Sequence, residues 1–334
     1  MSTSERSAVE ISPFGTASSG VAGGASIPLA AMEKDEVGAE LPAGTTVGHW
    51  TDVAGRTGCT VVLAADGAVG GVDVRGAAPG TLGTDALRPT RLVEQAHAIL
   101  LTGGSAFGLA AATGVMRWLE EHGAGFAMGP ARVPIVAGAV IFDLVVGDPR
   151  AWPDAEAGYA ACRAATRQPQ IGSVGAGTGA SVAKAGGRTE MRPGGVGLAS
   201  ARAGDALVSA VMVANGVGGI WDDEGQEWVA PLTRWDHASS LISGANTTIG
   251  AVVTDAVLTK EQANRVATIA HDGLARAVRP AHTMYDGDTI FCLATGAARA
   301  PVDAVEAVAA EVVARSLADG VRAAQRPGDQ GSRP

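Results

Sequence analysis

Cysteine and aromatic residues are both scarce in this chain of 334 residues, where Phe, Trp and Tyr together make up only 4%. The three cysteines, Cys59, Cys162 and Cys292, are widely spaced and form no CxxC pair. This pattern excludes a disulfide framework and favours a reducing, cytoplasmic location. The N-terminus also lacks a basic segment followed by an apolar run, so we expect no secretory signal.

Positive charge is scarce as well. The formal net charge is −9, and no run of Lys and Arg exceeds two residues. Binding to nucleic acid or to an anionic membrane is therefore not expected. The most apolar long window, Ala98 to Leu119, is broken by four glycines and carries Arg117. It predicts a core strand followed by a helix rather than a membrane span.

Glycine and small apolar residues are abundant instead. The chain has 47 glycines and is 46% hydrophobic, which is enough for a sizeable core with many tight turns and close backbone approaches. Residues 1–36 are rich in Ser, Gly and Ala, and we predict that they form a mobile tail. Residues 37–325 are predicted to form a single domain, and residues 326–334 a second tail.

Hydrophobic periodicity predicts alternating strands and helices, which favours a layered α+β or α/β sandwich. A hairpin is predicted across Asp66-Gly67, with its two strands at 59–64 and 68–74. Three further strands are predicted at 206–214, 249–254 and 289–294. Helices are predicted at 85–98, at 105–122 with Gly123 as C-cap, at 153–167, at 259–276 with a capping box of Thr259 and Gln262, and at 301–318 with Pro301 first.

The segment Asn246-Thr247-Thr248, which leads into the apolar run Ile249 to Val253, is the most informative motif. A threonine placed between an asparagine and a buried strand is suited to cutting its own backbone. Thr247 would then supply both a nucleophilic hydroxyl and a free α-amine, whose pKa of about 8 suits proton transfer near neutral pH. The alternative is that two β-branched residues simply begin a strand.

Asp286 and Asp288 precede the predicted strand at 289–294 and lie two residues apart, so an extended backbone places both side chains on one face. Two neighbouring carboxylates raise each other's pKa and can hold a hydroxyl and an amine in place. A surface Asp-Gly turn is the alternative. A calcium loop is disfavoured because the EF-hand spacing and its closing Glu are absent.

Lys184 is the only charged residue between Ile171 and Gly187. The glycines around it suggest a phosphate cradle, but Ala185 stands where a P-loop requires Ser or Thr. Lys184 is therefore either a surface residue or a buried functional cation. Asn215 ends the predicted strand at 206–214, where it is either a turn residue or an amide donor to an oxyanion.

Other candidate sites are weaker. Ser105 follows two glycines, but Phe107 replaces the second glycine of a nucleophile elbow, so Ser105 is predicted to be a helix N-cap. The six histidines show no metal-binding spacing. We expect neither a metal nor a cofactor.

Taken in order, these segments resemble the self-processing family that includes L-aminopeptidase D-amidase/esterase, β-peptidyl aminopeptidases and the nylon-oligomer (6-aminohexanoate-oligomer) hydrolases. The resemblance spans residues 44 to 318, and its Asn-Thr-Thr and Asp-Gly-Asp-Thr motifs are most similar to those of the nylon-oligomer hydrolases. It rests on GGSAFGL from Gly103, VPIVAGAVIFDL from Val133, GAGTGASVAK ending at Lys184, Asn215, ANTTIGAVVTDA around Thr247 and HTMYDGDTIF around Asp286.

The resemblance implies an αββα sandwich of the N-terminal-nucleophile-hydrolase kind, cleaved between Asn246 and Thr247 and assembled as a tetramer of heterodimers. It also implies that Thr247 is the nucleophile, that Asp286 and Asp288 orient its hydroxyl and amine, and that Lys184 and Asn215 assist cleavage or bind the oxyanion. One departure is Phe142, which stands where the nylon-oligomer hydrolases carry a Tyr and cannot donate a hydrogen bond.

The expected activity is amide hydrolysis through an acyl-enzyme, on peptides, β-peptides or polyamide oligomers. Two other functions stay open at the level of sequence. An ornithine acetyltransferase-like enzyme would pass the acyl group from Thr247 to an amine instead of water. An unprocessed oligomer without activity would keep its chain intact.

Overall fold

The computed structural model describes residues 39–236 and 246–326. All of these residues belong to one unit that extends from Val37 to the C-terminus. The N-terminal tail predicted from the sequence and, apart from Arg326, the C-terminal tail lie outside the described residues.

A nine-stranded mixed sheet forms the centre of this unit, with the order β10-β11-β14-β16-β2-β4-β7-β3 and with β1 also paired to β2. Its strands are β1 (Thr46–Asp52), β2 (Thr57–Val74), β3 (Thr81–Leu82), β4 (Gln95–Thr102), β7 (Val136–Val140), β10 (Gly195–Ala203), β11 (Ala206–Ala214), β14 (Ile249–Ala256) and β16 (Thr289–Ala298). Most neighbours are antiparallel, but β14 pairs parallel with β16 and β4 pairs parallel with β7.

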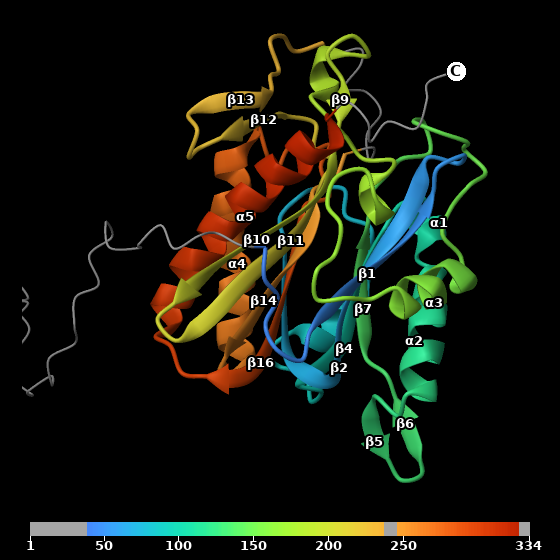
Figure 1. Ribbon diagram of the computed structural model, residues 1–334, viewed down its shortest axis with the longest axis vertical. Coiled ribbons are helices and arrows are strands. Elements are labelled where there is room, and N and C mark those ends of the chain that lie inside the picture. The colour runs from blue at the N-terminus through green and yellow to red at the C-terminus, as the bar shows by residue number, and fades with distance from the viewer. Residues whose placement is uncertain (1–38, 237–245, 327–334) are drawn as a thin grey trace, which may run out of the picture. The chain divides into compact units, whose positions relative to one another are not determined.

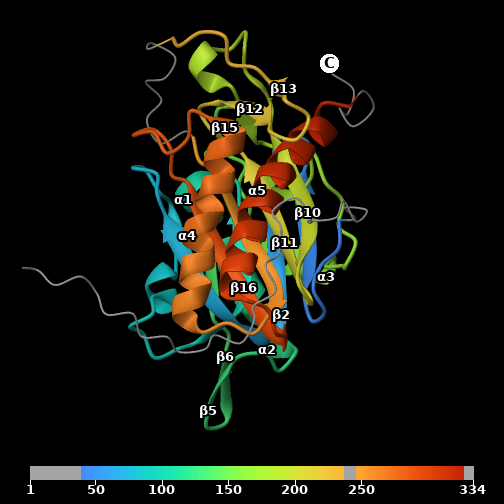
Figure 2. The same ribbon diagram turned by 90° about the vertical axis from the view of Figure 1, so that its left-hand side faces the viewer.

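Helices cover both outer sides of the strands (Figure 1). The long helices α4 (Lys260–Ala277) and α5 (Val302–Ala324) pack side by side on one side, as Figure 2 also shows. The shorter helices α2 (Ala111–Glu121) and α3 (Ala155–Arg163) pack together on the other side, next to the one-turn helix α1 (Ser105–Gly108).

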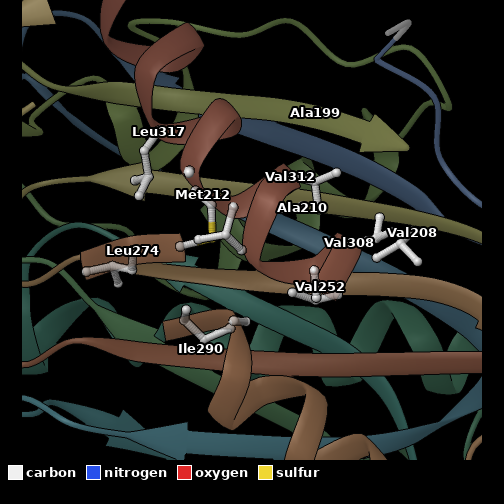
Figure 3. Close-up of a cluster of buried hydrophobic side chains, with 14 of the residues drawn as sticks. Ala199, Val208, Ala210, Met212, Val252, Leu274, Ile290, Val308, Val312 and Leu317 are labelled. Carbon is white, nitrogen blue, oxygen red and sulfur yellow. The ribbon is translucent and has the colours of Figure 1, made fainter. Parts of the chain in front are cut away.

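Three hydrophobic clusters reveal four layers. The first cluster joins α4 and α5 to one face of β11, β14 and β16 (Figure 3). The second contains the opposite faces of those strands together with residues of β1, β2, β4 and β7, so it fills the space between two halves of the sheet. The third joins the outer face of β2 and β4 to α2 and α3. The fold is therefore an αββα sandwich, as expected from the sequence.

Alternation along single strands produces these layers. In β11, Val211 and Val213 face the space between the two halves of the sheet, whereas Ala210 and Met212 face α5 and α4. The same alternation occurs in β4, where Ile99 points inward and the side chain of Leu100 packs toward α2 and α3. Successive side chains of a strand point to opposite faces, so a strand buried on both faces is apolar throughout.

Several local predictions are confirmed. Helix α4 begins with the predicted capping box, in which Thr259 accepts a hydrogen bond from the Gln262 backbone and the Gln262 side chain accepts one from Thr259. Strand β11 has the predicted bounds, 206–214. Helix α5 begins at Val302, so Pro301 is its N-cap and not its first residue as predicted. The helix continues to Ala324, because it stays in contact with β10 beyond residue 318.

The predicted hairpin across Asp66-Gly67 is wrong. Strand β2 runs through this position without turning back, and its register with β4 shifts between Leu63 and Ala68. Gly67 has a φ of +88°, which glycine adopts at little cost, so it serves a strand irregularity here instead of a turn. The irregularity allows the first half of β2 to pair with β1 and β4, and the second half to pair with β16.

The predicted helix at 85–98 is also wrong. Only one 3-10 turn, η2 (Thr84–Leu87), forms there, and strand β4 begins at Gln95. The apolar run of β4 is compatible with either structure locally. The segment forms a strand because it pairs with β2 on one side and with β7 on the other.

Short elements complete the unit. The strands β12, β13 and β15 form a three-stranded sheet, while β5 pairs with β6 and β8 with β9. Their bounds, with those of two 3-10 turns, are β5 (Phe126–Met128), β6 (Ala131–Val133), η3 (Gly175–Gly177), β8 (Ser181–Val182), η4 (Lys184–Gly186), β9 (Arg192–Pro193), β12 (Gly219–Asp222), β13 (Glu227–Ala230) and β15 (Val278–Arg279).

Candidate active site

The neighbouring strands β11, β14 and β16 carry polar residues at the ends that lie at one edge of the sheet. Val213 near the end of β11 pairs with Ile249 at the start of β14, and Ile249 pairs with Thr289 at the start of β16. Because β11 runs antiparallel to the other two strands, its C-terminal end lies beside their N-terminal ends. This arrangement brings Asn215, Thr247 and the Asp286–Asp288 segment to the same edge.

Both sides of the peptide bond between Asn246 and Thr247 are held by hydrogen bonds. The Thr247 hydroxyl, whose residue is only 3% exposed, donates to the Asn246 carbonyl oxygen at 2.5 Å. The Gly287 backbone N–H donates to the same oxygen at 3.0 Å, and the Thr247 N–H donates to the Asn215 carbonyl at 3.1 Å. Two donors on one carbonyl oxygen polarise that carbonyl toward nucleophilic attack.

Gly287 is a site residue that the sequence analysis missed. A Cβ at this position would lie 2.4 Å from the carbonyl oxygen of Ala78, so a larger residue would displace the backbone that carries the N–H donor. The only sequence signal is its position between two carboxylates, where a surface turn is the alternative interpretation.

Asp286 and Asp288 are both 1% exposed, so the alternative of a surface turn is wrong. Asp286 accepts hydrogen bonds from the Val217 N–H and from the N–H and hydroxyl of Thr283. Asp288 accepts one from the Thr248 N–H at 2.7 Å. Burial, followed by the neighbouring charge of Asp288, raises the pKa of Asp286 to about 6.

Lys184 is partly buried and lies beside Asn215. Its Nζ donates to the Asn215 carbonyl at 2.9 Å and to the Asn215 Oδ1 at 2.8 Å. Loss of water around the ammonium group lowers the pKa of Lys184 to about 7, against the opposing influence of Asp286 and Asp143. The Asn215 carbonyl accepts hydrogen bonds from both Lys184 and the Thr247 N–H, so it links the cation to the threonine.

Asp143 is a second residue that the sequence analysis did not single out. It is 2% exposed, follows β7, and accepts hydrogen bonds at 2.7 Å from the Gly104 N–H and the Thr57 hydroxyl. Burial raises the pKa of Asp143, whereas the hydrogen bonds from Gly104 and Thr57 and the nearby Lys184 oppose that shift. A lone Asp within an apolar segment was the available signal. The preceding Phe142 is half-buried.

The structure also corrects the prediction for Ser105. The N-cap of α1 is Gly104, no side chain caps the helix, and Ser105 itself has a φ of +52°. The glycine-rich segment at 172–187 forms turns η3 and η4 around the short strand β8, in place of the strand, loop and helix that bind phosphate.

Within residues 39–236 and 246–326, no group of three or more His, Cys, Asp or Glu side chains could hold a metal ion. In the same part of the chain, every helix is too short or too polar to form a membrane span.

The αββα fold and the two donors on the Asn246 carbonyl are features expected of an amide-bond hydrolase. The sequence comparison identifies the family, because residues 43–332 match the model of peptidase family S58. The chain belongs to this family. It is a hydrolase that acts on amide bonds, as the resemblance implied.

Relatives and solved structures agree. An uncharacterized aminopeptidase of Mycobacterium tuberculosis is 45% identical over 303 residues, which cover 80% of this chain and 86% of the relative. The 6-aminohexanoate-oligomer endohydrolase of a Kocuria species is 33% identical, over 80% of this chain and 78% of the relative. A Burkholderia β-aminopeptidase structure is 26% identical with a TM-score of 0.63, and covers 84% of each chain. The fold also matches the L-aminopeptidase D-Ala-esterase/amidase of Ochrobactrum anthropi, described as a variant of the Ntn-hydrolase fold, with a TM-score of 0.64 at 17% identity over 83% of each chain.

Proposed function

We propose that this chain cleaves itself between Asn246 and Thr247, and that Thr247 then acts as the N-terminal nucleophile of an amidohydrolase. The observation that carries this proposal is the contact between the Thr247 hydroxyl and the carbonyl of the peptide bond on its own N-terminal side. The Gly287 N–H on that carbonyl oxygen supplies a donor for the oxyanion that forms during attack.

Self-cleavage proceeds as an N→O acyl shift. The Thr247 Oγ1 attacks the Asn246 carbonyl carbon, the bond from that carbon to the Thr247 nitrogen breaks, and the nitrogen takes up a proton. Water then hydrolyses the resulting ester, which restores the Thr247 hydroxyl and leaves a carboxylate on Asn246. The products are residues 1–246 and a subunit of 334 − 246 = 88 residues that begins with Thr247.

Lys184 supports both stages of the reaction. With a pKa of about 7, a substantial fraction of its side chains are neutral at neutral pH and able to accept the threonine proton. After cleavage, the new α-amine and the Lys184 Nζ share the Asn215 carbonyl as their acceptor. Protonated Lys184 therefore disfavours protonation of the amine, which keeps the amine available as a base. Asp286 and Asp288 orient the threonine and its neighbours.

Hydrolysis of the substrate repeats the same chemistry. Thr247 Oγ1 attacks the substrate amide, the α-amine carries the proton to the leaving amine, and water releases the acyl group. Peptides are the first substrate class, because the relatives at 45–48% identity carry the name aminopeptidase. Oligomers of 6-aminohexanoate are the second, supported by the endohydrolase relatives. Phe142 has no hydroxyl group that could form a hydrogen bond with a substrate of either class.

Assembly and location complete the proposal. We propose a tetramer of processed heterodimers in the cytoplasm, on the basis of the family resemblance and the unpaired cysteines. Light scattering coupled to size exclusion tests the assembly, with the mass of four processed chains as the expected result.

Denaturing mass spectrometry of the purified chain tests self-cleavage directly. We expect two species, one of which begins with Thr247. A chain that stays whole after prolonged incubation would contradict the proposal and favour the unprocessed, inactive oligomer. A substrate panel of peptides, β-peptides and 6-aminohexanoate oligomers then defines the substrate. Addition of an amine acceptor distinguishes hydrolysis from acyl transfer, because a transferase would convert the acyl group into a new amide.

A further inference from the structure

Residues 286–289 carry the Gly287 N–H and lie between two other stretches of backbone. On one side, residues 246–248 run parallel to them, and the Gly287 nitrogen lies 3.0 Å from the Asn246 carbonyl oxygen. On the other side, residues 75–78 continue the antiparallel pairing of β2 with β16 beyond the end of β2. The donor to the attacked carbonyl therefore sits on the middle one of three backbone segments, and only the first of these contains the bond to be cut.

The third segment contacts the peptide unit that carries this donor. The Ala78 N–H donates to the Asp286 carbonyl oxygen, with 2.9 Å between nitrogen and oxygen. The carbonyl of Asp286 and the N–H of Gly287 belong to one planar peptide unit, in which the C=O and N–H bonds point in opposite directions. The bond from Ala78 on one side of this unit therefore fixes the direction of the N–H on the other side.

Arg75 anchors the third segment. Its N–H donates to the Asp288 carbonyl at 3.0 Å, and its guanidinium donates to the Thr268 carbonyl of α4 and to the Asp73 carboxylate, both at 2.8 Å. Self-cleavage breaks no bond in these segments. The support for the donor therefore stays in place when Asn246 becomes a chain end.

Glycine allows the two segments to approach each other closely. A Cβ on Gly76 would lie 2.2 Å from the Asp286 carbonyl oxygen and 2.4 Å from the Asp288 nitrogen. In the same way, a Cβ on Gly287 would lie 2.4 Å from the Ala78 carbonyl oxygen. The φ of Gly76 is not positive, so the lack of space, and not the backbone conformation, requires glycine at this position.

We propose that residues 75–78 are a positioning segment that holds the Gly287 N–H on the carbonyl attacked by Thr247, first in self-cleavage and then in substrate hydrolysis. This inference rests on the proposed function, because the direction of this N–H matters to catalysis only if Thr247 is the nucleophile. The bond from Ala78 also polarises the peptide unit, which strengthens its N–H as a donor. An oxyanion donor acts through its position relative to the developing charge, so a small displacement lowers the rate.

Two changes test the segment at different points. Gly76→Ala places a methyl group against the Asp286 carbonyl and should displace the segment. Replacement of Ala78 by L-lactic acid, through nonsense suppression, converts its N–H into an ester oxygen and keeps the methyl group. The second change deletes the donor without adding volume, so it tests the proposal even if Gly76→Ala fails to fold.

Each change has a matched control. Gly48→Ala creates a similar overlap far from the site, because a Cβ at Gly48 would lie 1.9 Å from the Ala161 carbonyl oxygen of α3. L-lactic acid at Ala77 makes the same ester one residue earlier. Among the described residues, the Ala77 N–H makes no backbone hydrogen bond to residues 286–289.

The first readout is kinetic. Self-cleavage should slow about 10- to 100-fold in both test variants, because the donor on the attacked carbonyl is misplaced or weakened. Enzyme that has been processed after long incubation should show a lower kcat per processed subunit, with KM within about twofold of the wild type. Both controls should be processed at the wild-type rate, although Gly48→Ala should lower the unfolding temperature. Wild-type rates of cleavage in both test variants would overturn the proposal.

The second readout uses the uncut chain. The sequence has only three asparagines, and in a Thr247→Ala background Asn246 alone precedes an alanine. Labelling with ¹³C-carbonyl Asn and ¹⁵N-Ala therefore selects the Asn246 carbonyl, which no longer has a hydroxyl donor but keeps the Gly287 N–H. We expect Gly76→Ala to move this ¹³C signal upfield, as a carbonyl does when its hydrogen bond weakens. Gly48→Ala should leave the signal in place.

These measurements distinguish this inference from the proposed function. If the wild type stays whole but the carbonyl signal moves in Gly76→Ala, the proposed function fails and the positioning of the donor stands. If the wild type cuts itself and the signal does not move, the inference about residues 75–78 fails alone.

Discussion

The strand pair β11–β14 ends in two very different ways. At one end, the Thr254 hydroxyl donates to the Leu207 carbonyl at 2.8 Å, and the Leu207 N–H donates to Asp255 at 2.7 Å. At this end, side chains of β14 therefore form hydrogen bonds with both backbone polar groups of Leu207. At the other end, Asn215, Asn246 and Thr248 each keep a buried side-chain polar atom that has no hydrogen-bond partner among the described residues.

An unpaired buried polar group costs about 1–3 kcal/mol, so folding stability alone does not explain the second end. Such groups are typical of sites that sacrifice stability for chemistry. The comparison teaches that one strand pair serves as structure at one end and as a reactive site at the other. Four experiments break or sharpen this contrast.

The largest effect is expected from removal of the nucleophile. Thr247→Ala should leave one uncut chain and lower hydrolysis by at least about 10⁴-fold, because no hydroxyl remains to form the acyl-enzyme. Denaturing mass spectrometry and a hydrolysis assay measure both outcomes. The control at the structural end is Thr254→Val, which should still be processed but lose about 1–3 kcal/mol of stability through its unpaired backbone partners. Cleavage of Thr247→Ala at the normal site would remove Thr247 from its proposed role.

Removal of either carboxylate should have the next largest effect. Asp286→Asn and Asp288→Asn keep the size of the side chain but not its charge, and each should lower turnover about 10²-fold. Steady-state kinetics checks the loss, and circular dichroism checks that the fold persists. Asp255→Asn, at the structural end of β14, is the control and should keep wild-type turnover. Normal kinetics in both site variants would return the segment to a structural role.

Two buried or partly buried lysines allow a sharper test of charge. Lys184→Met should slow self-cleavage about 10- to 100-fold, because a proton acceptor and a local positive charge are lost. Lys260→Met is the matched control, since the Lys260 Nζ donates to the carbonyls of Ala86, Arg91 and Val93 and so holds a loop. It should lose stability while processing continues. Time courses of cleavage and thermal unfolding measure the two properties. Normal processing in Lys184→Met would exclude Lys184 from the site.

The last experiment concerns the dependence of stability on pH. The pKa of Lys184 is about 7 in the folded chain and about 10.4 when unfolded, so between these values the unfolded state binds more protons. This lysine therefore adds stability as pH rises from 7 to 10, by at most about 1.4 kcal/mol per pH unit. Denaturant unfolding of Thr247→Ala, with and without Lys184→Met, isolates this contribution as a difference. Parallel pH curves for the two chains would contradict a lowered Lys184 pKa.

The local elements that formed as predicted are those in which sequence and burial agree. The capping box at Thr259 and the apolar run of β11 each depend on a few consecutive residues. The family resemblance rested on short motifs in a fixed order, and the match to peptidase family S58 over residues 43–332 confirms it.

The errors lie where distant contacts override local preference. Asp66-Gly67 has the composition of a hairpin turn, yet β2 passes through it because each half of the strand finds partners in a different half of the sheet. The residues before β4 were predicted to be helical, but pairing on both sides extended Gln95–Thr102. The partner strands β4 and β16 of β2, and the partners β2 and β7 of β4, lie more than ten residues away in the sequence, so a local sequence window does not reveal them.

The sequence by itself determined the class of fold, the family and the candidate residues Lys184, Asn215, Thr247, Asp286 and Asp288, because these depend on residue type and order. Tertiary structure decided which atoms meet. The parallel pairing of β14 with β16 places the Gly287 N–H on the Asn246 carbonyl, and the continuation of β2 places the Ala78 N–H on the Asp286 carbonyl. Hydrogen-bond geometry and loss of solvent set these contacts and the pKa values that follow from them, and both arise only when segments distant in sequence are packed together.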